Sequence, residues 1–177
     1  PYGKYCGRVI GASYGNIYTR KKQYKMQESE ESLDFVKNII YAKAYNSRKI
    51  LIRGKLDHKD KVDVLRLEEA IDAIKILMLE IRNCSNKDSV RGIEGTIARF
   101  YFSVLDELII KQREDFYFIE RSKRPPMDRF NALISFLYSL LTNNIAAALE
   151  GVGIDSYAGF FHTDRPGRVS MALDIIE

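Results

Sequence analysis

Residues 62–84, VDVLRLEEAIDAIKILMLEIRNC, decide the fold class of this chain. Apolar and charged residues recur here at the spacing of about 3.6 residues that is typical of an amphipathic helix. The polar stretch NCSNKDS at 83–89 interrupts this pattern. The sequence therefore predicts a long helix with one apolar face packed against a core.

Further helices are predicted on both sides of this one. Residues 28–53 begin with acidic side chains and carry Lys and Arg later, which is the charge order that a helix dipole favours. Residues 89–112, residues 129–150 and a segment from about Ser170 onward also have helical patterns. Charged or proline-broken connectors separate these segments. We therefore expect a mainly α fold.

The N-terminal segment, residues 1–26, has a different character. It is dense in Gly and Tyr, with short β-type pieces around Arg8–Ile10 and Asn16–Tyr18. Two strands cannot form a stable sheet alone, so we expect them to be the last strands of a β domain, followed by a linker. We expect residues 27–177 to form a multi-helix domain that continues beyond Glu177, because the last helix is still in progress there.

Composition sets loose bounds on function. The net charge of +4 and the pI of about 9.0 mildly favour an anionic partner. Cys6 and Cys84 match no zinc or redox spacing, which favours free thiols in a reducing cytoplasm. The most apolar segment, residues 131–153, is interrupted by the polar triplet at 142–144. We therefore predict a buried central helix there and no membrane span.

Glu94 is the first candidate for chemistry, because it is the single carboxylate on an otherwise apolar stripe of residues 90–108. A buried carboxylate needs a cation, a metal ion or a set of donors. Gly92 and Gly95 flank it, and missing side chains would let another element or a ligand approach. A Glu paired with an arginine, or lying at a wet edge of the stripe, is the alternative.

His162 lies in the loop before the last helix and is the second candidate. A lone histidine is usually hydrogen-bonded in a core or on a surface. However, Asp174 and Glu177 stand three residues apart and project from one face of that helix. An imidazole and carboxylates without a thiolate suit Mg²⁺ or Mn²⁺, although Zn²⁺ stays open. His58 lies in a charged run and is expected to be a surface residue.

Basic residues could serve an anionic substrate, although solvated basic faces have the same composition. The runs RSKRPP and TDRPGR supply Arg124, Arg165 and Arg168 as candidates for phosphate contacts. No glycine-rich phosphate loop, Ser-His-Asp set or zinc-finger spacing is present.

Five segments, in this order, resemble the CRISPR-associated integrase-nuclease of spacer acquisition, the Cas-one family. They are GNIYTRKKQY (15–24), AYNSRKILIR (44–53), GIEGTIARFYF (92–102), RSKRPPMDRFNALISFLYSLL (121–141) and GFFHTDRPGRVSMALDIIE (159–177). The resemblance implies that the tail of a β-sandwich domain precedes a helical catalytic domain. It also places Glu94, His162 and Glu177 on the family's metal-ligand positions, with Asp174 as a ligand or a residue that supports one.

The resemblance further implies a function: a Mg²⁺- or Mn²⁺-dependent DNA endonuclease that inserts short DNA fragments into a CRISPR array. It implies double-stranded DNA (fragment and CRISPR repeat), homodimerisation and a small Cas-two protein bridging two dimers as partners. Two alternatives stay open. One is a non-catalytic DNA-binding or scaffolding subunit with the same fold, which the three ligand positions disfavour. The other is a hydrolase of small phosphoesters, which the scattered basic segments disfavour.

Overall fold

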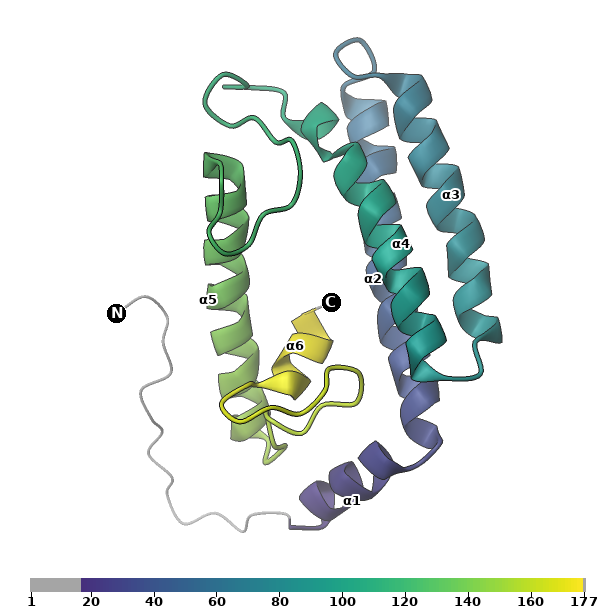
Figure 1. The fold of residues 1–177 in the computed structure, drawn as a ribbon, viewed down its shortest axis with the longest axis vertical. Helices are drawn as coiled ribbons and strands as arrows, with labels where there is room; N and C mark the ends of the chain where they lie inside the picture. Colours follow the sequence, from purple (N-terminus) through teal and green to yellow (C-terminus); the bar gives the residue numbers. More distant parts are fainter. Residues whose placement is uncertain (1–16, 177) are drawn as a thin grey trace. The chain divides into compact units, whose positions relative to one another are not determined.

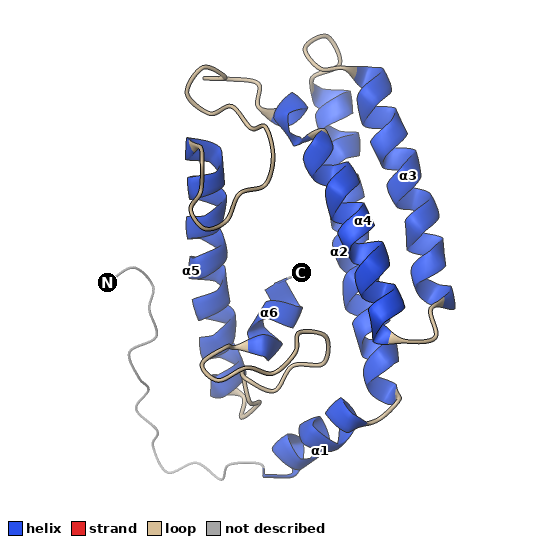
Figure 2. Ribbon diagram, in the orientation of Figure 1, coloured by secondary structure: helices blue, strands red, loops and turns tan. Residues whose placement is uncertain are grey.

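The computed structural model describes residues 17–176, and every regular element in that range is helical (Figure 2). The mainly α prediction is therefore confirmed. The elements in chain order are α1 (Ile17–Glu28), α2 (Glu31–Asp57), α3 (Val64–Asn83), α4 (Lys87–Ser103), the short 3-10 helix η1 (Leu105–Leu108), α5 (Arg129–Gly151) and α6 (Ser170–Ile176).

The chain divides into two compact units. The bundle unit is Ile40–Ser135, and the terminal unit joins the chain up to Ile39 with the chain from Phe136 onward. Helices α2 and α5 each contribute residues to both units.

In the bundle unit, α3 and α4 run side by side (Figure 1), and the later part of α2 contacts α3 through Arg48 and Lys55. Helix α3 is the segment that the sequence predicts most clearly. It buries one face at helical spacing: Leu67, Ala70, Ile71, Ile74, Met78 and Ile81. Polar caps fix where the helices begin, since Asp63 Oδ1 accepts the Arg66 amide (3.0 Å) and Asn86 Oδ1 accepts the Ser89 amide (2.8 Å).

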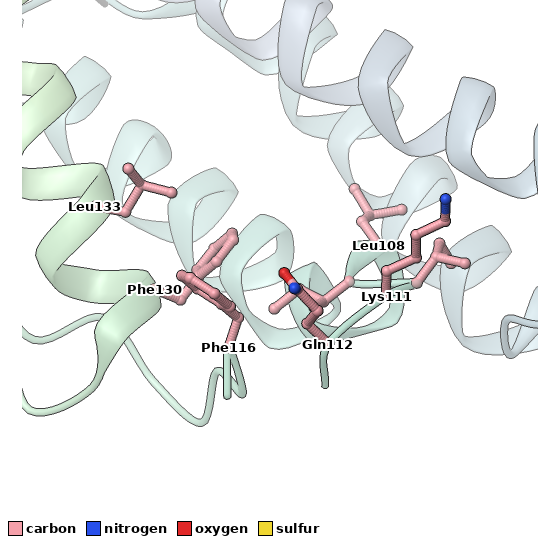
Figure 3. A pocket seen from close by; sticks show the side chains of 8 residues that line it. Leu108, Lys111, Gln112, Phe116, Phe130 and Leu133 are labelled. Carbon is pink, nitrogen blue, oxygen red and sulfur yellow. The ribbon is translucent and has the colours of Figure 1, made fainter. Parts of the chain in front are cut away.

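A second small core of the bundle unit follows α4. Leu105, Ile109 and Phe118 are buried together, with aromatic side chains packed around them. Beside this core lies an apolar pocket of about 310 Å³ between the 108–116 segment and the first turn of α5 (Figure 3). Phe116 and Phe130 lie close together in its wall. The pocket contains none of the predicted site residues.

Asn131 organises the connector that leads into α5. Its side chain is fully buried, accepts from Arg121 Nη1 (2.8 Å) and donates to the Glu120 carbonyl (2.8 Å) and the Asp128 carboxylate (2.6 Å). Arg121 also donates to the hydroxyl of Ser135. These contacts show that Arg121, Asp128 and Asn131 of this segment support the connector.

In the terminal unit, a long loop leads from the end of α5 to α6 (Figure 1). The Ser156 carbonyl accepts the Met171 amide (3.0 Å), which holds the loop against the first turn of α6. Phe160 is buried and stacks edge-on against Phe35, with ring centroids 4.7 Å apart. The loop is therefore packed on both of its sides.

Two local predictions are wrong. The strand expected at Asn16–Tyr18 is helical at Ile17 and Tyr18, where α1 begins. Helix formers such as Lys, Arg, Gln and Met dominate α1, and tertiary hydrogen bonds stabilise it. The helix expected over 89–112 ends at Ser103, because Val104 leaves the helical conformation (φ −118°, ψ 4°) and η1 follows. The strand expected at Arg8–Ile10 lies outside the described residues.

The prediction of a buried central helix at 131–153 is also wrong for the described chain. On α5, Leu133, Phe136 and Leu137 are 43%, 50% and 52% exposed. The apolar composition of α5 indicates that its side chains favour burial. It does not identify the segment that would bury them. Among residues 17–176, α5 alone has the length and composition to cross a membrane. The polar triplet at 142–144 interrupts the apolar sequence of this helix.

Candidate metal-binding residues

Asp174 forms the most constrained polar cluster near a predicted site residue. Its carboxylate on α6 is fully buried. Oδ2 accepts the amides of Phe160 (2.6 Å) and Phe161 (2.9 Å). Oδ1 accepts the amide of His162 (2.9 Å) and lies 2.7 Å from its Nδ1. Both oxygens are therefore occupied by contacts to one three-residue segment, which we call the Asp174 clamp.

The Asp174 clamp decides how the imidazole of His162 is presented. Three backbone amides donate to the Asp174 carboxylate, and its Oδ1 also lies 2.7 Å from Nδ1 of His162. Nδ1 is therefore engaged by Asp174, and Nε2 is the ring nitrogen that this contact does not use. The His162 side chain is 23% exposed, so the ring is half-buried and still accessible. Nε2 is therefore the nitrogen of His162 that could bind a metal ion.

Gly159 is necessary for the close approach of the loop to α6. A Cβ atom at this position would lie 2.8 Å from Ser170 Cβ and 3.0 Å from Asp174 Oδ2. Real side chains essentially never approach backbone-fixed neighbours at 2.8 Å, so any larger residue would push the loop away. The glycine at the start of GFFH therefore has a steric role in the Asp174 clamp.

Glu94 on α4 is held in a different way. Its Oε1 lies 2.6 Å from the Nζ atom of Lys43 on α2, and the two side chains are 22% and 20% exposed. This contact realises the alternative of an ion-paired glutamate, with lysine in place of arginine. An added Cβ at Gly92 or Gly95 would meet nothing within 4 Å. No other described element therefore packs closely against these two glycines.

The predicted ligands are distributed over the two units. Glu94 belongs to the bundle unit, His162 and Asp174 belong to the terminal unit, and Glu177 lies outside the described residues. Within 17–176, no three His, Cys, Asp or Glu side chains form a group that could hold a metal ion. A shared site made by Glu94, His162 and Glu177 therefore stays a prediction.

The remaining sequence candidates are accessible or peripheral. Arg124 and Arg165 are exposed and Arg168 is half-buried, so DNA contacts by them stay a prediction. His58 is half-buried just after α2. Cys84 is a free, buried thiol, whereas Cys6 lies outside the described residues.

Two residues were missed from the sequence. Lys43 contacts Glu94 across 51 positions of sequence, and Gln23 contacts the loop before His162 across more than 130. Gln23 lies in one of the five quoted segments, but its spacing gave no sign of a distant partner. Its burial is unusual for a polar residue, and only the folded chain reveals the partner.

Comparison with known proteins identifies the class of this fold. The family model described as "CRISPR associated protein Cas1" matches residues 1–177. The chain is 42% identical over 179 residues to a protein named CRISPR-associated endonuclease Cas1 2 from Rhodospirillum rubrum, covering 99% of this chain and 52% of that one. This chain therefore belongs to the Cas1 family, and the resemblance in the sequence is confirmed.

Solved structures agree with this assignment. A chain of a structure titled "Partial Cas6-RT-Cas1--Cas2 complex" is 25% identical, with a TM-score of 0.84 over 99% of this chain and 51% of that one. A chain of "Casposase bound to integration product" is 26% identical, with a TM-score of 0.75 over 98% and 46%. This chain spans about half the length of the curated relatives from Rhodospirillum rubrum and Chlorobaculum tepidum.

Proposed function

We propose that the protein is a divalent-metal-dependent DNA endonuclease and integrase of CRISPR adaptation, acting in the cytoplasm. Membership of the Cas1 family supports this proposal, as does the relative named an endonuclease. The similarity to a casposase bound to its integration product supports an integration reaction. The observation that carries the chemistry is the Asp174 clamp, which engages Nδ1 of His162 and leaves Nε2 as the nitrogen that could bind an ion.

The residues fit a Mg²⁺ or Mn²⁺ ion by the chemistry of their donors. Glu94 and Glu177 would supply carboxylate oxygens, and His162 would supply Nε2. Asp174 supports the ligand His162 instead of binding the ion, because each of its oxygens already accepts two hydrogen bonds. When bound, such an ion stabilises the charge that develops on the attacked phosphate.

The chain's own residues would orient DNA for in-line attack. In integration the nucleophile is the 3′-hydroxyl of the incoming fragment, and in hydrolysis it is water. Arg124 and Arg165 are exposed and suited to phosphate contacts, and Arg168, three residues after Arg165, is half-buried. We propose double-stranded DNA, a second copy of the chain and a Cas2 protein as partners, the last because a matching structure is a Cas1–Cas2 complex.

The test uses the full-length protein and a His162→Ala variant, with His58→Ala as a matched control. We expect DNA cleavage or integration only with Mn²⁺ or Mg²⁺. We expect His162→Ala to reduce it about 100-fold or more, because losing a ligand should cost at least as much as losing a residue that supports one. DNA binding should stay nearly intact. Unchanged activity of His162→Ala would refute the site, and wild-type DNA binding without any cleavage would favour a non-catalytic subunit.

A further inference from the structure

Helix α1 contacts the loop that leads to His162, and Gln23 is the centre of this contact. Gln23 is 7% exposed. Its Nε2 donates to the carbonyls of Asp155 (2.8 Å) and Ala158 (3.0 Å), and its Oε1 accepts the Asp155 amide (2.9 Å). One side chain therefore satisfies three backbone groups of the loop, as a neighbouring strand would.

Arg20 and Tyr24 extend this contact along the same helix. Arg20 Nε donates to the Gly153 carbonyl (3.1 Å), and its guanidinium lies 3.6 Å from a Glu150 oxygen. The Tyr24 hydroxyl donates to Asp155 Oδ2 (2.6 Å). The three side chains hold a short segment of the loop, residues 153–158.

Electrostatics at this contact agree with its geometry. The hydrogen bond to the Asp155 carboxylate is the main reason why the pKa of Tyr24 lies above 10.0. Partial burial acts to raise the pKa of Asp155. However, hydrogen bonds from the Tyr24 hydroxyl and the Tyr157 amide outweigh burial, so this pKa lies below 3.8. Asp155 is therefore an ionised acceptor at neutral pH.

The segment held by α1 is directly continuous with the Asp174 clamp. Ala158 contacts Gln23, and Phe160 contacts Asp174, with the sterically required Gly159 between them. A shift of the Ala158 carbonyl therefore displaces the amides that Asp174 accepts. The position of the His162 ring depends on the same amides.

We propose that α1 is a positioning element of the metal site: Gln23, supported by Arg20 and Tyr24, fixes residues 153–158 and thereby sets the position of His162. This inference rests on the proposed function, because it treats His162 as a metal ligand. The sequence motif that contains Gln23 thus acts on the site through the loop, from a helix that precedes the site by more than 130 residues.

The first experiment compares Gln23→Leu with wild type in the full-length protein. We expect amide hydrogen exchange at residues 159–162 to become faster, because the carbonyl contacts that fix the loop are lost. We also expect Mn²⁺ affinity, measured by calorimetry without DNA, to fall about tenfold, as for other residues that support a ligand. Lys22→Leu, an exposed change on the same helix, is the control and should alter neither quantity.

A second pair of variants keeps the test valid if Gln23→Leu does not fold. Gln23→Glu preserves size but removes both donors, so it should reproduce the faster exchange and the weaker Mn²⁺ binding. Tyr24→Phe removes one exposed hydrogen bond and should have a smaller effect in the same direction. Global unfolding of each variant is followed by circular dichroism, so that a local effect on residues 159–162 is separated from a general loss of stability.

The outcomes distinguish this inference from the proposed function. If Gln23→Leu and Gln23→Glu fold and keep Mn²⁺ affinity within about twofold of wild type while His162→Ala abolishes binding, the positioning role of α1 is overturned and the site stands. If wild type itself binds no Mn²⁺, the proposed function fails. In that case, amide hydrogen exchange at residues 159–162 is the measurement that tests whether Gln23 fixes the loop.

Discussion

The two units hold their candidate ligands in opposite ways. In the bundle unit, Glu94 has a single half-buried ion pair with the flexible side chain of Lys43. In the terminal unit, His162 is fixed by a fully buried carboxylate that also accepts three backbone amides. The flexible lysine side chain can move away from Glu94 at the cost of one contact, whereas opening the Asp174 clamp breaks four. The contact of Glu94 is therefore exchangeable, and the orientation of His162 is fixed by the fold.

Asp174→Ala tests the rigid side of this comparison and should have the largest effect. It leaves three buried or half-buried amides and an imidazole without their acceptor, and each unsatisfied buried group costs about 1–3 kcal/mol. We expect the free energy of unfolding to fall by about 3 kcal/mol or more in urea titrations. The exposed Asp72→Ala is the control. Loss of less than about 1 kcal/mol would show that the clamp is not a structural element.

Gly159→Ala tests the same clamp by steric means and should have an intermediate effect. The added Cβ would lie 2.8 Å from Ser170 Cβ, and such overpacking typically costs about 1–3 kcal/mol. Gly92→Ala is the matched control, because open space surrounds a Cβ on this helical glycine. That change should stabilise the protein by about 0.5–1 kcal/mol in thermal unfolding. Equal effects of the two changes would contradict the steric role of Gly159.

Lys43→Met tests the exchangeable side and should have the smallest effect on stability. Both side chains are mostly buried but still reach solvent, so the pair lies between exposed and buried ion pairs, and its loss should lower the free energy of unfolding by about 1 kcal/mol. Under the proposed function, Lys43 and a metal ion compete for Glu94, so Mn²⁺ affinity in calorimetry should be retained or rise. A fall as large as that of His162→Ala would instead mean that Lys43 keeps Glu94 in place for the metal.

The sequence predicted the helices that have a periodic apolar pattern. The apolar spacing of α3 and the polar stretch after it placed that helix to within two residues. The prediction for α1 failed because its helix has no apolar stripe to detect, and its polar side chains find their partners in a distant loop. The early end of α4 was missed for a related reason. Val104 and Leu105 are buried as the period predicts, but in a 3-10 turn.

The candidate site was predictable only as a set of residue types. The motif and the spacing of Asp174 and Glu177 left open whether Asp174 binds an ion. Three of its partners are backbone amides, which leave no signature in the sequence. Lys43 could not be predicted for a different reason. The chain has 28 basic residues, and no sequence pattern indicates which of them pairs with Glu94, 51 positions away from Lys43.

The hydrogen bonds between α1 and the loop at 153–158 also have a consequence for the order of events during synthesis. They join residues 131 to 135 positions apart, so α1 leaves the ribosome long before its partners exist. The α3–α4 pair is local and can fold in the meantime. Glu94 is thus in place early, whereas the geometry of His162 is completed only after Asp174 has been synthesised. A nascent chain or a fragment that ends before the loop would therefore contain the folded α3–α4 pair without the Asp174 clamp.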